Sequence, residues 1–285
     1  MAIDLKTTNG ATGQALDLIR AIADRKERPT PWVDADAFPW RDEAFSSRFV
    51  RRANYQELYG MKETGDEVDD LAGLINRGAK ARVLDLCSGN GRHAIAMALR
   101  GYRVTGIDVG PGPVSLARET AKNLGLTVDF RLLDIKSVSF EDAYEAAYLT
   151  CAGLSDFSPA DAAEILSLAE RALAPGGKLI VEYADIASAP AADVRSWQYV
   201  QAERSLFEDG PHLQLDERLY DSEARASVSR SFVVASDGHV GEFAQCRQYY
   251  AADAVRELLK AAHLEPIGTS DGSAPGLVKM AAKKA

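Results

Sequence analysis

The chain has 285 residues with a hydrophobic fraction of 46%, which suits one large α/β domain or one domain that carries an insertion. Its net charge is −9 and no basic run exceeds the Lys283-Lys284 pair, so nucleic acid is not expected as a general partner. No segment reaches the length of a membrane span, no secretory signal begins the chain, and three scattered cysteines predict neither disulfides nor a metal site; we expect a soluble, cytoplasmic protein.

The sequence pattern of residues 1–78 predicts a helical cap that precedes the main domain. Apolar residues recur at helical spacing over 16–23 and, with breaks expected at Gly60 and Gly65, over 43–75; a connector rich in proline and aromatic residues separates the two helical regions. The second helix carries three residues that stand four apart and therefore share one face: Arg51, Tyr55 and Tyr59. That face either lines a site or packs on the core as an aromatic stripe beside a solvated arginine.

The main domain is expected to span residues 79–285, and its first part alternates short apolar runs with helical segments. The predicted strands are 82–87, 102–109, 128–134, 145–150 and 178–184, and the predicted helices are 92–100, 114–124 and 159–173. Ser158 followed by Pro159 is a typical start for the last of these helices. Continuous apolar strands joined by helices indicate a doubly wound, mostly parallel sheet with helices on both faces.

The pattern changes after Ala184, because three long, half-polar runs with strict alternation follow: 212–220, 227–235 and 241–250. They predict an antiparallel three-strand insertion over about 186–250. A helix over 251–264 and two strands, 265–271 and 276–283, then complete the domain.

The first predicted strand enters a helix through a turn that contains Gly89 and Gly91. Glycines at such a turn permit a positive φ and let a ligand approach the backbone closely. Three acids mark the ends of successive strands: Asp85, Asp108 and Asp134. Because the carboxyl ends of parallel strands meet at one edge of a sheet, we expect these acids to converge on one crevice.

These features resemble the class I (seven-stranded, Rossmann-like) methyltransferase family, small-molecule type. DLCSGNGRHA is similar to the first family motif, GIDV to the second, LLDI to the third, and LAPGGKLIVE to the segment before the fifth strand. The resemblance covers roughly residues 80–184 strongly and implies the strand order 3-2-1-4-5-7-6. Cys87-Ser88 departs from the family's usual Gly-Cys-Gly or Gly-Ala-Gly, so the loop has one glycine fewer.

The resemblance implies that the cofactor is S-adenosyl-L-methionine, with S-adenosyl-L-homocysteine as product. Cys87, Gly89 and Gly91 would line its methionine part, and Asp85 would act through its amino group. Asp108 would hold the ribose hydroxyls, and Val109 would lie against the adenine. Asp134 and the Ile135 amide would bind the adenine edge, unless Asp134 only caps the next helix. Thr150 and Cys151 would face the sulfonium. Cys87 and Cys151 are expected to be packing residues rather than nucleophiles. Arg51 would pair with the carboxylate, on the helix that also carries Tyr59.

The acceptor is expected to be a small molecule methylated on oxygen, nitrogen or carbon, for example a natural product. The insertion resembles the acceptor lids, or the dimer-forming sheets, of small-molecule methyltransferases, which leaves a homo-oligomer open. Glu182 is the candidate general base, with a loop cap as its alternative, and a carboxylate acceptor would need no base. Arg247 and Tyr249 are further catalytic candidates, because they alternate onto one face of the last insertion strand.

Two other functions fit parts of the pattern. Gly89-x-Gly91-x-x-Ala94 with Asp108 satisfies a loose NAD(P) oxidoreductase pattern, although Asp85 lies where a pyrophosphate would pass. A non-catalytic scaffold that kept the cofactor fold is the second alternative. Methylation of nucleic-acid bases is disfavoured, because YLTCAGLSDF lacks the Asn/Asp-Pro-Pro-aromatic signature.

Overall fold

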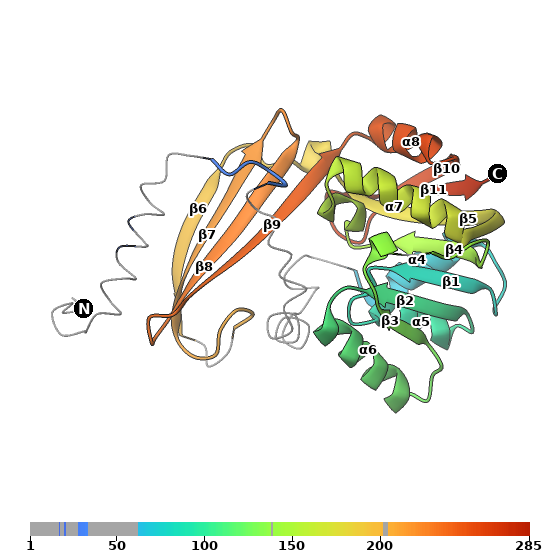
Figure 1. The fold of residues 1–285 in the computed structure, drawn as a ribbon, viewed down its shortest axis with the longest axis horizontal. Coiled ribbons are helices and arrows are strands. Elements are labelled where there is room, and N and C mark those ends of the chain that lie inside the picture. The colour runs from blue at the N-terminus through green and yellow to red at the C-terminus, as the bar shows by residue number, and fades with distance from the viewer. Residues whose placement is uncertain (1–16, 18–19, 21–27, 34–61, 138, 202–204) are drawn as a thin grey trace.

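A computed structural model describes residues 17, 20, 28–33, 62–137, 139–201 and 205–285 of the chain (Figure 1). Most of the predicted cap over residues 1–78 lies outside these ranges, so the division into cap and main domain stays a prediction. The described part of the cap includes the helix α4 (Thr64–Ile75), whose Val68, Leu71 and Ile75 are buried.

The centre of the molecule is a sheet in which five parallel strands are followed by an antiparallel pair. In spatial order the parallel strands are β3 (Asp129–Leu132), β2 (Arg103–Asp108), β1 (Arg82–Leu86), β4 (Tyr144–Leu149) and β5 (Leu173–Asp185). β11 (Leu277–Lys284) runs antiparallel to β5, and β10 (Leu264–Asp271) pairs with the outer side of β11. The order 3-2-1-4-5-7-6 predicted for the central sheet is therefore confirmed.

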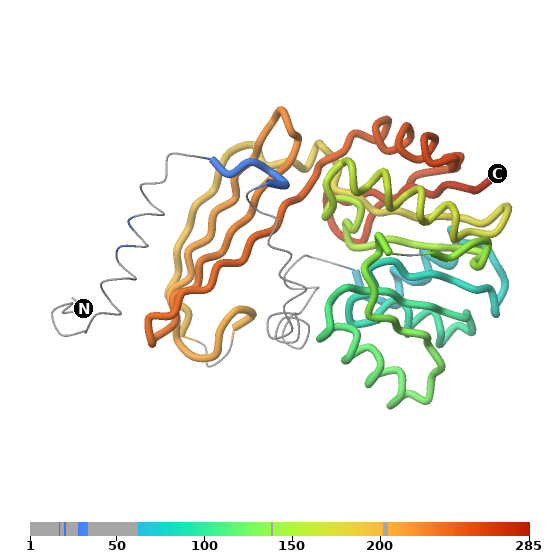
Figure 2. The backbone as a smooth tube through the Cα atoms, in the orientation of Figure 1, coloured from blue at the N-terminus to red at the C-terminus, as the bar shows by residue number. Residues whose placement is uncertain are grey.

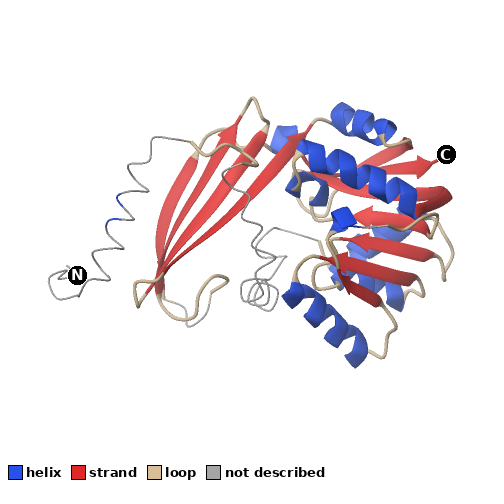
Figure 3. Cartoon of the chain, in the orientation of Figure 1, coloured by secondary structure: helices blue, strands red, loops and turns tan. Residues whose placement is uncertain are grey.

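Helices cover both faces of this sheet (Figure 3). α4, α5 (Arg92–Leu99) and α6 (Pro111–Asn123) bury apolar side chains in one core, together with Val83, Ala146 and Ile180 of the sheet. α7 (Pro159–Ala172) and α8 (Ala252–Ala261) enclose the other core. Residues that alternate along a strand divide between the two cores, as a sheet buried on both faces requires.

Two helix starts show how local sequence sets the boundaries. The backbone N–H of Asp161 donates to the Ser158 hydroxyl at 3.1 Å, which is the predicted N-terminal cap of α7. The sequence pattern placed the start of α6 at residue 114, and this is wrong by one turn. The helix begins at Pro111, because proline is favoured in the first turn, where its missing N–H breaks no helical bond.

The insertion is a second, antiparallel sheet that extends from the carboxyl end of the central sheet (Figures 1 and 2). It contains four strands rather than the predicted three: β6 (Val194–Val200), β7 (His212–Asp221), β8 (Ala226–Ala235) and β9 (Val240–Tyr250). β6 escaped prediction because it is an exposed edge strand without the alternation of buried and polar residues. β9 joins the central sheet at its end, where Ala184 pairs with Tyr249 and Asp185 with Tyr250.

Short 3₁₀ helices follow three of the central strands: η2 (Ile135–Ser137) after β3, η3 (Gly153–Asp156) after β4 and η4 (Ile186–Ser188) after β5. All three therefore lie at the carboxyl edge, where the strand-end acids converge. None of the helices that the structure describes is long and apolar enough to cross a membrane.

Candidate functional site

The turn between β1 and α5 is held in a conformation that exposes its backbone. φ is +60° at Cys87, +55° at Gly89 and +77° at Gly91, all in the left-handed region. A Cβ atom on Gly91 would lie 2.5 Å from Cζ of Phe130, so this glycine is required by packing. A Cβ atom on Gly89 would meet no atom within 4 Å. Gly89 therefore borders open space, as a close approach of a ligand to the loop requires.

Asp108 lies at the end of β2 and contacts this turn. Its Oδ2 accepts from the backbone N–H of Gly89 at 2.8 Å, and its Oδ1 accepts from Gly110 N–H at 2.8 Å. Burial raises the pKa of Asp108, although the backbone hydrogen bonds oppose this change. Val109 is half-buried beside it. The structure thus brings Asp108 and Gly89 together as predicted, whereas a ribose contact remains a prediction.

Asp85 is buried beneath the same turn, at 2% exposure. Burial raises the pKa of its carboxyl to about 8 although the neighbouring Tyr148 hydroxyl lowers it, and the nearby charge of Asp108 acts in the same direction as burial. Within the described part of the chain, Asp85 Oδ2 and Ser88 Oγ are buried without a hydrogen-bond partner. Such unsatisfied polar atoms are uncommon in folded proteins, so their place next to the open glycine turn favours a polar ligand there.

Asp134 and Ile135 mark the transition from β3 to η2. Asp134 Oδ1 accepts from the backbone N–H of Lys136 at 3.0 Å, so the capping role considered from sequence is present. Asp134 is half-buried and Ile135 is buried. A contact of either residue with adenine stays a prediction.

Thr150 and Cys151 follow β4 and are both half-buried. The Thr150 hydroxyl lies 3.3 Å from His93 Nδ1, and the Cys151 thiol accepts from Arg92 Nη2 at 3.1 Å. Burial raises the pKa of the Cys151 thiol to about 11 despite the nearby Arg92 charge. A thiol with such a pKa is a poor nucleophile at neutral pH, which favours the packing role.

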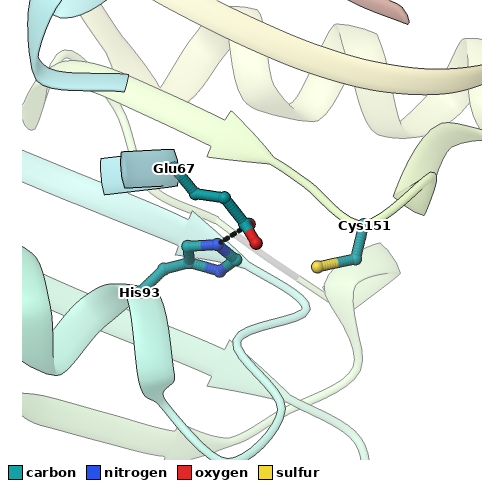
Figure 4. Close-up of side chains that lie close together, drawn as sticks. All are labelled: Glu67, His93 and Cys151. Atoms are coloured by element: carbon teal, nitrogen blue, oxygen red, sulfur yellow. Dashed lines mark hydrogen bonds and ion pairs between the residues drawn. The ribbon is translucent and has the colours of Figure 1, made fainter. Parts of the chain in front are cut away.

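A buried cluster that the sequence did not predict ties α4 to this site (Figure 4). Glu67 of α4 lies 2.6 Å from His93 Nε2 and accepts from Arg92 Nη2 at 2.9 Å. Burial alone would raise the pKa of Glu67, but hydrogen bonds from His93 and Arg92 outweigh it and lower that pKa. For His93, burial lowers the pKa more than Glu67 raises it.

Donor atoms of Glu67, His93 and Cys151 lie within 4.8 Å of one another, a spacing that suits metal ligands. However, the Arg92 guanidinium contacts both Glu67 and Cys151, so it already supplies the positive charge. The His93 nitrogen that faces Glu67 is engaged as well. The geometry therefore favours an ion-pair cluster over a cation site.

Glu182, the candidate base, is fully buried, and its carboxylate is surrounded by donors. Oε2 accepts from Ala152 N–H at 2.9 Å and from the Ser273 hydroxyl at 2.7 Å, and Oε1 accepts from Ser273 N–H at 2.7 Å. The carboxylate therefore joins the segment after β4 to Ser273, which follows β10. These contacts favour the loop-cap alternative for Glu182 over a proton-accepting role.

The last insertion strand brings side chains to η3. Arg247 Nη2 lies 3.6 Å from Asp156 Oδ1, and Gln245 Nε2 donates to the same oxygen at 3.1 Å. Tyr249 is buried, with its hydroxyl 3.3 Å from the Ser227 hydroxyl and its ring edge-on to Tyr220. Arg247 thus lies where the insertion meets the central sheet, whereas catalytic roles for Arg247 and Tyr249 stay predictions.

Arg51 and Tyr59 fall outside the described residues, so their placement in the site is likewise a prediction. Sequence reasoning also missed Asp156 and Glu67. Asp156 follows β4 by seven positions, too far for the rule that strand-end acids converge. Glu67 contacts the site only because α4 packs on α5, a pairing that no local pattern indicates.

Part of the site lies in a segment that matches a known family. Residues 83–177 match the model of a family described as a methyltransferase domain. The ubiquinone biosynthesis O-methyltransferase of Pseudomonas aeruginosa (strain UCBPP-PA14) is 32% identical over 114 residues, which are 40% of this chain and 47% of that protein. The ubiquinone biosynthesis O-methyltransferase of Marinobacter nauticus is 34% identical over 116 residues, which are 40% of this chain and 47% of that protein. The chain spans about half the length of these relatives.

Solved structures resemble a larger part of the chain, at low identity. An S-adenosylmethionine-dependent methyltransferase from Clostridium acetobutylicum has a TM-score of 0.63 at 12% identity, covering 85% of this chain and 97% of that one. A sugar N-methyltransferase from a Streptoalloteichus species has a TM-score of 0.60 at 16% identity, covering 92% and 100%. An amino pentose methyltransferase from Micromonospora echinaspora has a TM-score of 0.58 at 19% identity, covering 79% and 92%. These likenesses establish the fold.

Proposed function

We propose that the protein is a class I, S-adenosylmethionine-dependent methyltransferase that transfers a methyl group to a small-molecule acceptor; residues 83–177 match a methyltransferase domain, and the fold is that of such an enzyme. The observation that carries the proposal is the open backbone at Gly89, which borders Asp108 and lies above the buried Asp85. The curated relatives named as O-methyltransferases and the structural neighbours named as sugar methyltransferases support a small acceptor.

The residues present fit this cofactor. Asp108 is a strand-end carboxylate of the kind that accepts ribose hydroxyls, and Gly89 leaves room for the ligand to reach the backbone. The unpartnered oxygen of Asp85 suits a buried ammonium group. In the proposed site Asp134 and Ile135 hold the adenine, while Thr150 and Cys151 border the sulfonium. Arg51 and Tyr59 of the predicted cap would close over the methionine part.

Bound S-adenosylmethionine would supply an activated methyl group with a good leaving group. The protein then has to align donor and acceptor in line and keep water out. The Glu67–Arg92–Cys151 contacts and the Glu182–Ala152 bond hold the segment that follows β4. That segment includes Thr150 and Cys151, so we assign these contacts the alignment of the site. Arg247 and Tyr249 stand on the insertion, which in this proposal covers the acceptor.

The test is calorimetric titration of the purified chain with S-adenosylhomocysteine, with NAD in parallel. Micromolar binding of the first ligand and none of the second is expected. An Asp108→Ala variant should lose that binding, whereas Asp129→Ala, an exposed acid on the neighbouring strand, should keep it. Failure of the folded wild-type chain to bind S-adenosylhomocysteine would refute the proposal. No finding favours the NAD(P) or scaffold alternative.

We also propose that the insertion forms a homodimer through its edge strand. Trp197 and Tyr199 of β6 are 73% and 59% exposed, and among the described strands β6 pairs only with β7. Unprotected edges with apolar side chains are prone to pair with another chain. Light scattering should report a dimer for the wild type and a monomer for Trp197→Lys; a monomeric wild type would refute this arrangement.

The remaining parts of the proposal concern location and partners. The chain's three cysteines are free thiols, which suits a reducing compartment such as the cytoplasm. The net charge of −9 argues against nucleic acid as a partner.

A further inference from the structure

Asp156 occupies the junction between the two sheets. It is the last residue of η3, directly after the segment Thr150–Ala152 that borders the proposed methyl-transfer position. On the other side it contacts Gln245 and Arg247 of β9. Because β9 meets β5 at Ala184, this strand reaches the carboxyl edge at the same place. A carboxylate therefore stands where the cofactor site meets the insertion.

The Asp156 carboxylate is only half engaged. Both contacts from the insertion are made to Oδ1, at 3.1 Å from Gln245 and 3.6 Å from Arg247. Oδ2 receives no hydrogen bond from any residue that the structure describes. The side chain is 36% exposed, so a ligand can reach it. Arg247 and Gln245 thus fix the orientation of the carboxylate and leave one oxygen for another donor.

The electrostatic surroundings of the junction are negative. Burial raises the pKa of the Asp156 carboxyl, and Arg247 opposes this change. The Cys87 thiol on the glycine turn is solvent-exposed, yet desolvation by the protein around it and then the charges of Asp108 and Asp156 raise its pKa. Asp85 and Asp134 contribute in the same direction. The charges of Asp108, Asp134 and Asp156 in this crevice disfavour an anionic nucleophile such as a phenolate or a carboxylate, and they attract a cation.

Building on the proposed methyl transfer, we infer that Asp156 holds the nucleophile of the acceptor and that this nucleophile is an amine. An amine arrives as a cation, donates N–H to Oδ2, and becomes a neutral nucleophile by giving one proton to the Asp156 carboxylate. In the step, the nitrogen lone pair forms the new N–C bond while the S–C bond breaks, and the electron pair stays on sulfur as a neutral thioether. The product leaves as the methylated ammonium, and Asp156 returns its proton to solvent.

Sinefungin tests this inference without knowledge of the acceptor. This analogue of S-adenosylmethionine carries an amine-bearing carbon in place of the methyl sulfonium, so its ammonium lies at the position of the transferred methyl group. Calorimetry would compare sinefungin, S-adenosylmethionine and S-adenosylhomocysteine on the wild type, Asp156→Asn and the control Asp253→Asn. Asp253 is an exposed acid in the first turn of α8, where it pairs with Arg256.

We expect Asp156→Asn to weaken sinefungin about tenfold relative to S-adenosylhomocysteine, as loss of one charge-assisted hydrogen bond would. S-adenosylmethionine should change less than threefold, and the control should change neither ratio. If Asp156→Asn leaves the affinity for sinefungin relative to S-adenosylhomocysteine unchanged, the inference is overturned. It is also overturned if the variant loses as much affinity for S-adenosylmethionine as for sinefungin, since Asp156 would then recognise the sulfonium. Asp156→Ala replaces the Asn variant if the latter does not fold. Failure of the wild type to bind S-adenosylhomocysteine would instead refute the proposed function.

Discussion

Ser273 donates two hydrogen bonds to the Glu182 carboxylate, from its backbone N–H to Oε1 and from its hydroxyl to Oε2, both at 2.7 Å. The same carboxylate accepts from Ala152 N–H. In turn the Ser273 carbonyl accepts from the backbone N–H of Lys62 at 2.9 Å. One buried side chain thus connects the segment after β4, the β10–β11 turn and the chain that leads into α4.

Replacing Glu182 by glutamine should therefore destabilise the fold. An amide can offer only one accepting oxygen, so its NH2 group would face a backbone donor and leave that donor unsatisfied. We expect the free energy of unfolding to fall by about 2–3 kcal/mol for Glu182→Gln. Ser273→Ala removes one hydroxyl donor and should cost about 1 kcal/mol. Urea denaturation measures both; equal stability of Glu182→Gln and wild type would show that the three bonds contribute nothing net.

The two glycines of the β1–α5 turn should respond differently to alanine. Gly91→Ala combines a positive φ with a Cβ 2.5 Å from Phe130, so we expect it to lower the free energy of unfolding by about 2–4 kcal/mol. Gly89→Ala meets open space, so only backbone strain of about 1 kcal/mol is expected. Its larger effect should be on S-adenosylhomocysteine affinity, because the new methyl group borders the proposed ligand. Chemical denaturation and calorimetry separate these effects; a Gly89→Ala variant with wild-type affinity would place the ligand elsewhere.

Asp85 gives the proposed cofactor affinity a pH dependence. With a pKa of about 8, its carboxyl is mostly protonated at pH 7 before binding, and pairing with an ammonium requires the charged form. Binding should then release a proton, and affinity should rise between pH 6.5 and about 8. Calorimetry in buffers of different ionisation enthalpy measures the proton release. Asp85→Asn should bind more weakly and without that release; proton uptake by the wild type would contradict the assignment.

The strands of the central sheet could be predicted from the sequence, because each has a local pattern typical of a buried strand. Residues 82–87 and 178–184 are apolar on both faces, and glycine turns or helix caps separate them from the helices. β6 could not be read in this way, because an exposed edge strand needs no apolar alternation. Its pairing with β7 is a property of the assembled insertion, in which Trp197 lies opposite Leu215.

The residues of the candidate site also fall into those that the sequence could predict and those that depend on the assembled fold. Asp85 and Asp108 were predictable, because topology alone brings the carboxyl ends of parallel strands together. The partners of His93 were not, since they arise where α4 packs on α5. Glu182 shows a further limit: its position at the carboxyl edge was predictable, but its role depends on Ala152 and Ser273, which only the fold brings within reach.

His93 should make the fold sensitive to mild acid. Burial lowers the pKa of His93 below the usual 6.5. Below pH 6.5, His93 therefore binds a proton in the unfolded chain more readily than in the folded chain. Stability is then fully present above pH 6.5 and declines as the pH falls, with a slope from this residue of at most about 1.4 kcal/mol per pH unit. Glu67, whose pKa is lowered by His93 and Arg92 against the effect of burial, adds a loss below pH 4.5. Between pH 7 and pH 5 the free energy of unfolding of His93→Gln, measured by chemical denaturation, should decline less steeply than that of the wild type. The control His239→Gln, at an exposed turn, should decline like the wild type. Parallel curves for the wild type and His93→Gln would assign the acid sensitivity to other groups.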